Sequence, residues 1–247
     1  MEQHYEQHYH RLEKSHFWFK ARRNFIVELL KDTSKQSKIL DVGCSSGLLL
    51  TDLKSNGFLD DNLYGIDISE TAIANCKKQG LQNCHLMSGD ALNFNQKFDV
   101  IIASDSLEHI NDDLKAVSNW KDHLTENGKI CIFVPAFNML WSQHDIENKH
   151  YRRYTKKQLI KVVSKTNLDV IRASYWNFSL FLPVLIIRKL QSISKHHKKN
   201  HQGDLKSVSL LNPILLGLLN LENYLLRFLN FPIGISTFCI AQKKSED

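Results

Sequence analysis

Proline and glycine are scarce in this sequence, with four and ten residues among 247. This scarcity excludes a collagen-like chain and a chain made mainly of flexible linkers. Hydrophobic residues make up 43% and charged residues 23%, so disorder along the whole length is excluded as well. The length fits one α/β domain with added segments.

Cysteines give no sign of a disulfide framework, because they are five in number and form no CxxC pair. The first fourteen residues, MEQHYEQHYHRLEK, lack the apolar core of a signal peptide. A reducing cytoplasm is therefore the expected location, at most with peripheral contact to the cytoplasmic membrane face.

Apolar runs long enough to span a membrane are also lacking. The run Phe178 to Ile187 is too short, and the run Val208 to Leu229 is interrupted by Asn212, Pro213, Asn220, Glu222 and Arg227. The net charge is +6, from 32 Lys and Arg against 26 Asp and Glu. This excess favours anionic partners in general, and nucleic-acid binding is not indicated by it.

From residue 38 onward, short β-branched runs alternate with helical segments, which is the rhythm of a parallel α/β sheet. Helices are expected over about Asn111 to Leu124 and after Thr155, whose side chain can cap the helix. Seven strands are expected, with the sequences KILDV, NLYGID, CHLMSGD, FDVIIAS, KICIFV, LDVIRASYW and ISTFCIAQK. We divide the chain into an N-terminal helical cap (1–35), a core (36–176), a helical insertion (177–233) and a final core strand with a tail (234–247).

The cap and the insertion differ in character from the core. The cap contains EQHYEQHY, which would place His4 with His8 and Tyr5 with Tyr9 on shared helix faces. Two such histidines can bind a metal, but no third ligand is fixed beside them, so a solvated helix is favoured. The insertion has two Leu-rich stretches joined by SKHHKKNHQGDLKS, and it can serve as a lid, a packing surface or a membrane-facing surface.

A glycine-containing turn follows the first expected strand. Gly43 and Gly47 bracket the sequence Cys44-Ser45-Ser46, and glycines at this place let the backbone approach a ligand at the carboxyl edge of a sheet. Asp67 ends the next strand, twenty-four residues after Gly43, where a carboxylate can accept both ribose hydroxyls of a nucleoside. Asp90 is expected to end the third strand and to accept a hydrogen bond from the exocyclic amine of an adenine.

The order of these motifs resembles the class I S-adenosylmethionine-dependent methyltransferases. The matching sequences are ILDVGCSSG, YGIDIS, SGDAL, FDVIIASDSLEHI and GKICIFVPAF, and the resemblance covers about residues 36 to 175. It implies a doubly wound, seven-stranded, Rossmann-like sheet with an antiparallel final strand. Ser45 stands where the family usually has a glycine, so either the turn tolerates a β-carbon or cofactor affinity is reduced.

The resemblance also implies the cofactor, S-adenosylmethionine, and the product, S-adenosylhomocysteine. It implies that nine residues contact the methionine portion, the ribose or the adenine of the cofactor or form the pocket floor. They are Asp41, Gly43, Cys44, Gly47, Asp67, Ile68, Asp90, Ala91 and Ser104. A nicotinamide cofactor would call for GxGxxG after the first strand, whereas the chain has GxxxG preceded by an aspartate.

The acceptor is expected at the loops after the fourth and fifth strands. The candidates for the base that removes a proton from the methyl acceptor are His144, Asp105 and His109. The sequences HFWFKARR and LWSQHDIENKHYRRYT resemble a bacterial methyltransferase group associated with surface-glycan or lipid-linked biosynthesis. They supply aromatic and cationic candidates for substrate binding, namely His16, Trp18, Arg22, Trp141, Asp145, His150, Arg152, Arg153 and Tyr154.

Structural roles for the same residues stay open at this stage. His109 can cap or pack at a loop, His144 and Asp145 can form a structural pair, and Arg152 with Arg153 can be solvated. A zinc site from His144, Asp145 and His150 matches no established spacing, so no metal is predicted.

The sequence therefore predicts an S-adenosylmethionine-dependent methyltransferase acting at O, N or C of a small-molecule, glycan or lipid-linked acceptor. The alternative is a non-catalytic cofactor-binding or membrane-associated assembly protein that retains the fold. Neither the acceptor nor the oligomeric state follows from the sequence.

Overall fold

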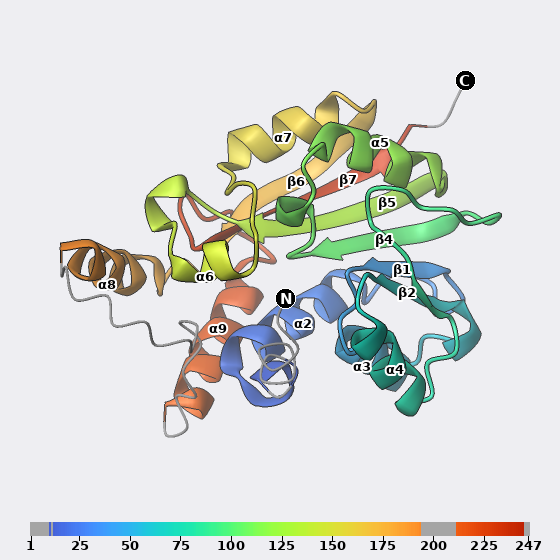
Figure 1. The fold of residues 1–247 in the computed structure, drawn as a ribbon, viewed down its shortest axis with the longest axis horizontal. Coiled ribbons are helices and arrows are strands. Elements are labelled where there is room, and N and C mark those ends of the chain that lie inside the picture. Colours follow the sequence, from blue (N-terminus) through green and yellow to red (C-terminus); the bar gives the residue numbers. More distant parts are fainter. Residues whose placement is uncertain (1–9, 11, 194–210, 245–247) are drawn as a thin grey trace.

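The computed structural model describes residues 10, 12–193 and 211–244 (Figure 1). Within these residues one sheet has seven strands in the order β3-β2-β1-β4-β5-β7-β6. The first five strands in that order pair in parallel, and β7 runs antiparallel to both β5 and β6. The strands are β1 (Ile39–Val42), β2 (Leu63–Asp67), β3 (Cys84–Leu86), β4 (Phe98–Ser104), β5 (Leu124–Pro135), β6 (Leu168–Trp176) and β7 (Ser236–Lys243). The predicted doubly wound fold with an antiparallel final strand is confirmed.

Helices cover both faces of the sheet. In Figure 1, α5 and α7 lie on one face and α2, α3 and α9 on the other. The described helices are α2 (Phe17–Leu29), α3 (Leu48–Ser55), α4 (Glu70–Lys78), α5 (Asp113–Asp122), α6 (Gln143–Glu147), α7 (Lys156–Ser164), α8 (Phe181–Ile193) and α9 (Asn212–Leu225), with short 3₁₀ turns η1 (Asp60–Asn62), η2 (Leu107–His109) and η3 (Asn138–Leu140).

Two hydrophobic cores result from this layering. On one face, Trp120 of α5 and Leu159 of α7 pack with β4 residues such as Ile101. On the other face, Phe25 of α2 lies edge-on to Phe238 of β7, with 5.3 Å between ring centroids. Each apolar face of the sheet is thus buried by amphipathic helices, as the alternating sequence pattern predicts.

Local capping agrees with the sequence. The Ser69 hydroxyl accepts a hydrogen bond from the Ala72 N–H at 3.1 Å, and Thr155 begins α7 in a reciprocal capping box with Gln158. The helix expected to reach Leu124 ends earlier, because Leu124 is fully buried and pairs with Phe98 as the start of β5.

The N-terminal cap and the C-terminal insertion pack against each other, which the sequence does not indicate. The Phe17 N–H donates to Asn212 Oδ1 at 2.7 Å, and Asn223 Nδ2 donates to the Ala21 carbonyl at 2.9 Å. Trp176 Nε1 in turn donates to Asn223 Oδ1 at 2.8 Å. Asn212, one of the residues that interrupt the Leu-rich run, and Asn223 therefore attach α9 to α2 and to the end of β6.

Helix α8 lies away from the sheet at the side of the molecule (Figure 1). In the described ranges, no helix has both the length and the apolar character needed to cross a membrane. The histidine–tyrosine repeat with His4 and His8, and the basic tract with Lys195, Lys198 and Lys199, fall outside the described residues.

Candidate functional site

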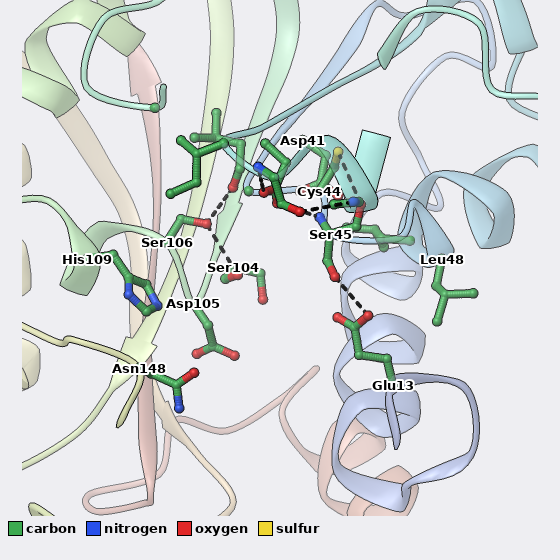
Figure 2. A pocket seen from close by; sticks show the side chains of 18 of the residues that line it. Glu13, Asp41, Cys44, Ser45, Leu48, Ser104, Asp105, Ser106, His109 and Asn148 are labelled. Atoms are coloured by element: carbon green, nitrogen blue, oxygen red, sulfur yellow. Dashed lines mark hydrogen bonds between the residues drawn. The ribbon is translucent and has the colours of Figure 1, made fainter. Parts of the chain in front are cut away.

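A cavity of about 640 Å³ opens at the carboxyl ends of β1, β2 and β4. Open α/β sheets bind ligands at this edge, and the volume suits a cofactor together with a small molecule. The predicted site residues that line it are Arg22, Asp41, Gly43, Cys44, Asp67, Ile68, Ser104, Asp105 and His109. Residues from four separate parts of the sequence are thus brought together (Figure 2).

Gly43 supplies the close approach that the turn after β1 requires. Its φ is +78°, and its N–H donates to the Ile66 carbonyl at 2.8 Å. A β-carbon at this position would clash with the hydroxyl oxygen of Ser106, which itself donates to the Val42 carbonyl. Glycine therefore lets the loop after β4 pack directly against the turn.

Gly47 shapes the packing of α3, the helix that follows the turn. It precedes α3 with φ of +78° and does not line the cavity. A β-carbon there would lie 2.5 Å from Leu81 Cδ1 and 2.9 Å from Cys76 Sγ. Gly47 thus allows α3 to approach the end of α4, while a contact with cofactor stays a prediction.

Asp67 is held in the cavity wall by backbone donors. Its Oδ2 accepts from the Ser45 N–H at 3.0 Å, and its Oδ1 accepts from the Ser69 N–H at 2.9 Å. Each carboxylate oxygen has further lone pairs, so the group can still accept hydroxyl hydrogen bonds. Ile68 beside it is 77% exposed and offers an apolar surface toward the cavity.

Asp41 lies deeper in the same wall. It is 4% exposed, and burial raises its pKa to about 8, with further contributions from Cys84, Asp67 and Glu13. The carboxyl group is therefore largely protonated at neutral pH. A cationic ligand in the cavity would favour its ionised form.

The prediction that Asp90 ends the third strand is wrong. β3 ends at Leu86. Leu86 pairs with Asp67, the last residue of β2, so no β2 residue remains to pair with the residues that follow. Asp90 and Ala91 lie beyond it in an exposed turn, outside the cavity lining. Their place at the cavity is taken by Met87, Ser88 and Gly89.

Arg22 lines the cavity from the side of α2, and its predicted role in substrate binding stays a prediction. It forms an ion pair with Asp105 and donates from Nη2 to Ser236 Oγ at 3.0 Å. Its guanidinium carbon lies 4.8 Å from the ring centroid of Trp176 and 5.6 Å from that of Trp18. Trp18 therefore supports Arg22 from outside the cavity lining. Asp105 has φ of +55°, a strained conformation typical of functional loops.

His109 faces the cavity from η2, next to Asp105 and Asn148 (Figure 2). The surrounding protein and the neighbouring His150 lower the pKa of His109 to about 4. The ring is therefore neutral at pH 7 and keeps one nitrogen lone pair. Glu108, directly before it, is fully buried, and burial raises the pKa of its carboxyl group.

His144 is not brought to the cavity. It lies on α6, where its ring contacts the Asn148 side chain at 3.1 Å, and its centroid is 6.1 Å from that of His150. Lining residues from the same part of the chain are Glu147, Asn148, Lys149 and Tyr151. A catalytic role for His144 finds no support in its position.

Asp145, Arg153 and His150 form a buried network. Both oxygens of Asp145 accept from Arg153, at 2.7 and 2.9 Å, and its Oδ1 also lies 2.9 Å from His150 Nδ1. The carboxyl group is fully buried, and despite that burial its hydrogen bonds with His150 and Arg153 hold its pKa well below the usual range. Asp145 and Arg153 lie outside the cavity lining, where they connect α6 to the segment before α7.

The remaining candidates for substrate binding also lie outside the cavity. Arg152 pairs with Asp113 at 3.1 Å, and the Tyr154 hydroxyl donates to the same carboxylate at 2.9 Å. His16 caps α2 by accepting from the Trp18 N–H at 3.3 Å, and Trp141 is 37% exposed. The structure gives Arg152, Tyr154 and His16 local structural contacts, and substrate roles for them stay predictions.

Sequence reasoning missed Glu13 as a site residue. It lines the cavity opposite Asp105 and His109, and its carboxylate accepts from the hydroxyl of Ser45 (Figure 2). The available signal was Ser45 itself, because a serine in place of the usual glycine brings a hydroxyl group that needs a hydrogen-bond partner. Glu108 was missed because nothing in the sequence Leu107-Glu108-His109 shows that the carboxyl group of Glu108 is buried.

A cofactor of the expected type fits these residues. One cavity is surrounded by the carboxylates of Asp41 and Asp67, by the exposed Ile68, and by Gly43, where a β-carbon would clash with Ser106. A family model described as a methyltransferase domain matches residues 12–173. The chain belongs to this family. Its sheet is the Rossmann-like fold of the S-adenosylmethionine-dependent methyltransferases.

Individual proteins agree with this assignment. The ubiquinone biosynthesis O-methyltransferase of Rickettsia canadensis (strain McKiel) is 34% identical over 116 residues, which are 43% of this chain and 48% of the relative. The match of this methyltransferase thus spans about half of that relative's length.

Two solved structures share the fold. The phosphoethanolamine N-methyltransferase 2 of Haemonchus contortus, in complex with S-adenosyl-L-methionine, has a TM-score of 0.57 at 16% identity, covering 90% of this chain and 52% of that chain. The magnesium protoporphyrin IX methyltransferase of Synechocystis PCC 6803, with bound S-adenosylhomocysteine, has a TM-score of 0.55 at 14% identity, covering 90% and 82%.

Proposed function

We propose that this methyltransferase transfers the methyl group of S-adenosylmethionine to a hydroxyl oxygen of a small apolar or lipid-linked acceptor. The observation that carries the proposal is the single cavity in which Asp41, Asp67 and the Gly43 turn face Asp105 and His109. One wall is built like a nucleoside site, and the other carries groups that can interact with a hydroxyl.

The cofactor would be held by the wall formed from β1 and β2. Asp67 would accept the ribose hydroxyls, Asp41 and the backbone at Gly43 would face the methionine portion, and Ile68 would pack against the adenine. When bound, the cofactor supplies an electrophilic methyl group on a positively charged sulfur.

Methyl transfer to a hydroxyl needs orientation, exclusion of water and a path for one proton. The reaction forms an O–C bond from an oxygen lone pair and breaks the S–C bond, whose electron pair stays on sulfur. The hydroxyl proton would pass to the free ring nitrogen of His109. In this protein Arg22 and Asp105 close the cavity between α2 and the loop after β4, and His109 offers a neutral ring on its wall.

Oxygen is proposed as the methylated atom because the curated relative is an O-methyltransferase. An apolar or lipid-linked acceptor is proposed because exposed apolar side chains gather on α8 and α9. They include Leu182, Ile186, Ile187 and Leu190 on α8, and Ile214, Leu218, Leu221, Tyr224 and Leu225 on α9. Unshielded apolar surface of this kind commonly marks a binding or membrane-contact site.

Transfer of a labelled methyl group tests the proposed function. The protein is incubated with methyl-labelled S-adenosylmethionine and separately with a bacterial lipid extract and a polar extract. We expect label in an organic-phase product, lost in Asp67→Ala and retained in His85→Gln, whose exposed ring lies on edge strand β3. Cofactor binding without transfer to any fraction would contradict the proposal and favour a non-catalytic assembly protein.

We also propose that the exposed surface of α8 and α9 contacts anionic lipid at the membrane interface. Lys195, Lys198 and Lys199 lie between the two helices in the sequence, and each lysine near an anionic surface contributes about 1 kcal/mol. Sedimentation with phosphatidylglycerol vesicles should rise with anionic lipid and fall partly at high salt. Replacement of the three lysines by Gln should reproduce the salt effect while cofactor binding is kept. Absence of binding at low salt would assign the surface to a lid or to subunit packing.

A further inference from the structure

Three cysteines meet beneath the turn that follows β1. Cys44 lies in that turn, Cys76 lies on α4 and Cys84 begins β3. Their sulfur atoms lie within 4.8 Å of one another, and the sulfurs of Cys44 and Cys76 are 3.9 Å apart in a hydrogen bond. Three separate parts of the chain thus bring free thiols into direct contact.

Two glycines make room for these sulfur atoms. A β-carbon at Gly65 of β2 would lie 2.8 Å from Cys44 Sγ and 3.0 Å from Cys84 Sγ. A β-carbon at Gly47 would lie 2.9 Å from Cys76 Sγ. All of these distances are shorter than real β-carbon contacts, so the cluster depends on glycine at both positions.

Cys44 is the member of the cluster that a small molecule in the cavity can reach. It lines the cavity beside Ser45, whereas Cys76 and Cys84 are outside the cavity lining (Figure 2). A cofactor held on the turn after β1 would cover Cys44. The thiol is therefore most accessible when no cofactor is bound.

The cluster also favours a thiolate, which is the reactive form of cysteine. Hydrogen bonds with Cys44 and Cys76 lower the pKa of Cys84 below its usual value, although burial acts in the opposite direction. Because the three thiols titrate together, the negative charge belongs to the group as a whole, Cys44 included. By contrast, burial raises the pKa of Cys131 and of Cys239 to about 12.

Cys131 and Cys239 provide an internal comparison. They are buried like the cluster, but Cys131 packs in the core on one face of the sheet and Cys239 in the core on the other. Neither lines the cavity. Burial of a cysteine as a small apolar residue is thus separable in this chain from a thiol cluster beside the cavity.

We propose that hydrogen peroxide joins Cys44 and Cys76 in a disulfide, and that this bond weakens cofactor binding. The Cys44 thiolate would attack one peroxide oxygen, so that an S–O bond forms, the O–O bond breaks and hydroxide leaves. Cys76 would then attack the sulfur of this sulfenic acid, so that the S–S bond forms and the S–O bond breaks. The two thiols lose two electrons, and their two protons end in the two water molecules formed from the peroxide.

The disulfide would displace the turn that carries Cys44. Disulfide sulfurs lie about 2.0 Å apart, well below the present 3.9 Å. Cys76 is held in α4, whereas Cys44 lies between Gly43 and Ser45, which both have positive φ. Movement would therefore fall on the turn and draw the Ser45 N–H away from Asp67, to which it donates at 3.0 Å.

The Ser45 carbonyl would lose contacts as well. It accepts hydrogen bonds from the thiols of Cys76, at 3.3 Å, and Cys44, at 3.8 Å, and a disulfide has no proton to donate. The effect on affinity rests on the proposed placement of the cofactor at Asp67. Formation of the disulfide does not rest on it.

Peptide mass spectrometry without reduction tests the disulfide. The full-length protein is reduced, freed of metal ions with a chelator and treated with hydrogen peroxide. We expect a cross-linked peptide pair that contains Cys44 and Cys76 and lacks two hydrogen atoms relative to the reduced peptides. No cross-link, or a cross-link to Cys84 in its place, overturns the proposal.

Calorimetry with S-adenosylmethionine tests the effect on the cofactor. Oxidation should weaken the affinity of the wild type at least about tenfold, because Asp67 loses a backbone donor that orients it. Dithiothreitol should restore the affinity, since a disulfide is reduced by thiol exchange. An unchanged affinity in protein with the mapped disulfide, or a loss that dithiothreitol does not reverse, overturns the proposal.

Two variants assign the effect to the cysteine pair. Cys76→Ser should bind like the reduced wild type both before and after peroxide, and Cys76→Ala repeats the test without a buried hydroxyl. The matched control Cys239→Ser also replaces a buried thiol, but it should lose affinity on oxidation as the wild type does. Thermal unfolding of the reduced proteins verifies that each variant is folded. Equal loss of affinity after peroxide in the Cys76 variants and the wild type overturns the proposal.

The labelled-methyl assay distinguishes this proposal from the proposed function. Reversible loss of cofactor binding with the mapped disulfide, but with no methyl transfer to any extract, contradicts the proposed function alone. Methyl transfer that peroxide leaves unchanged, in protein without the cross-link, contradicts the disulfide alone.

Discussion

Glu13 accepts a hydrogen bond from the Ser45 hydroxyl at 2.8 Å, which connects the N-terminal segment to the turn after β1. The same carboxylate oxygen accepts from Ser46 Oγ at 3.1 Å. Ser45 has φ of +46°, a conformation that costs a residue with a β-carbon roughly 1–2 kcal/mol. The turn therefore tolerates serine where the family usually has glycine, and the hydroxyl contact offsets part of the strain.

Two substitutions at this position separate strain from hydrogen bonding. Ser45→Ala and Ser45→Gly both lose the contact with Glu13, but only alanine keeps the β-carbon at positive φ. We expect Ser45→Gly to be more stable than Ser45→Ala by about 1 kcal/mol, or about 2–4 °C in thermal unfolding. Equal stability of the two variants would show that the backbone at residue 45 is not strained.

The sequence predicts the sheet well because strand and helix signals are local. β-branched runs such as FDVIIAS and caps such as Ser69 and Thr155 depend on neighbouring residues only. The predicted place of Asp67 at a strand end likewise needed only the order of elements.

Contacts between distant segments were not predictable in this way. Nothing near Asp145 in the sequence shows whether its carboxylate binds substrate or pairs with the buried Arg153. Asn223 contacts Ala21 across about two hundred residues, and Glu13 reaches Ser45 from another segment. Tertiary packing decides these pairs, so fewer of the predicted acceptor-side residues, which lie mostly on loops, line the cavity than of the predicted cofactor-side residues.

The free energy of unfolding of the cofactor-free protein should fall as pH rises, because the buried Asp41 is protonated in the folded state. Its pKa is raised from 3.8 to about 8 in the folded protein, so between these values the folded state holds a proton that the unfolded chain releases. The free energy of unfolding therefore falls from about pH 4 to about pH 8 and levels off above it.

Asp41→Asn removes this dependence. The variant should unfold at a higher temperature than the wild type near pH 8, and the difference should shrink toward pH 5. Each unit of pKa shift corresponds to about 1.4 kcal/mol, and 1 kcal/mol moves the unfolding temperature by about 2–4 °C at this size. Calorimetric unfolding across the pH range measures it, and a constant difference between the two proteins would contradict the assignment.

Arg153 is expected to act on stability and not on cofactor binding. Arg153→Ala leaves the fully buried Asp145 carboxylate without its two guanidinium hydrogen bonds, which should cost about 3–5 kcal/mol in urea unfolding. Arg153→Lys should lose less, because the charge is kept while the bidentate geometry is not. Unchanged stability with abolished methyl transfer would instead support the substrate role predicted from the sequence.

Asn223 should be a stability determinant of the α2–α9 contact. Asn223→Ala leaves the buried Trp176 Nε1 and the Ala21 carbonyl without this partner, at a cost of about 1–3 kcal/mol for each group. Asn220→Ala is the matched control, because Asn220 lies on the same helix, is exposed and contacts only Asn24 in the described bonds. Its effect should stay within about 0.5 kcal/mol. Similar losses in both variants would mean that α9 is not anchored through Asn223.

Titration calorimetry of S-adenosylmethionine with the wild type and Asp67→Ala tests whether the cavity at the carboxyl edge of the sheet is the cofactor site. We expect one binding site with a Kd in the micromolar range for the wild type, and an affinity at least about tenfold weaker for Asp67→Ala, since a carboxylate that accepts ribose hydroxyl hydrogen bonds is lost. Absence of binding to the wild type, or equal affinity of the two proteins, would contradict it.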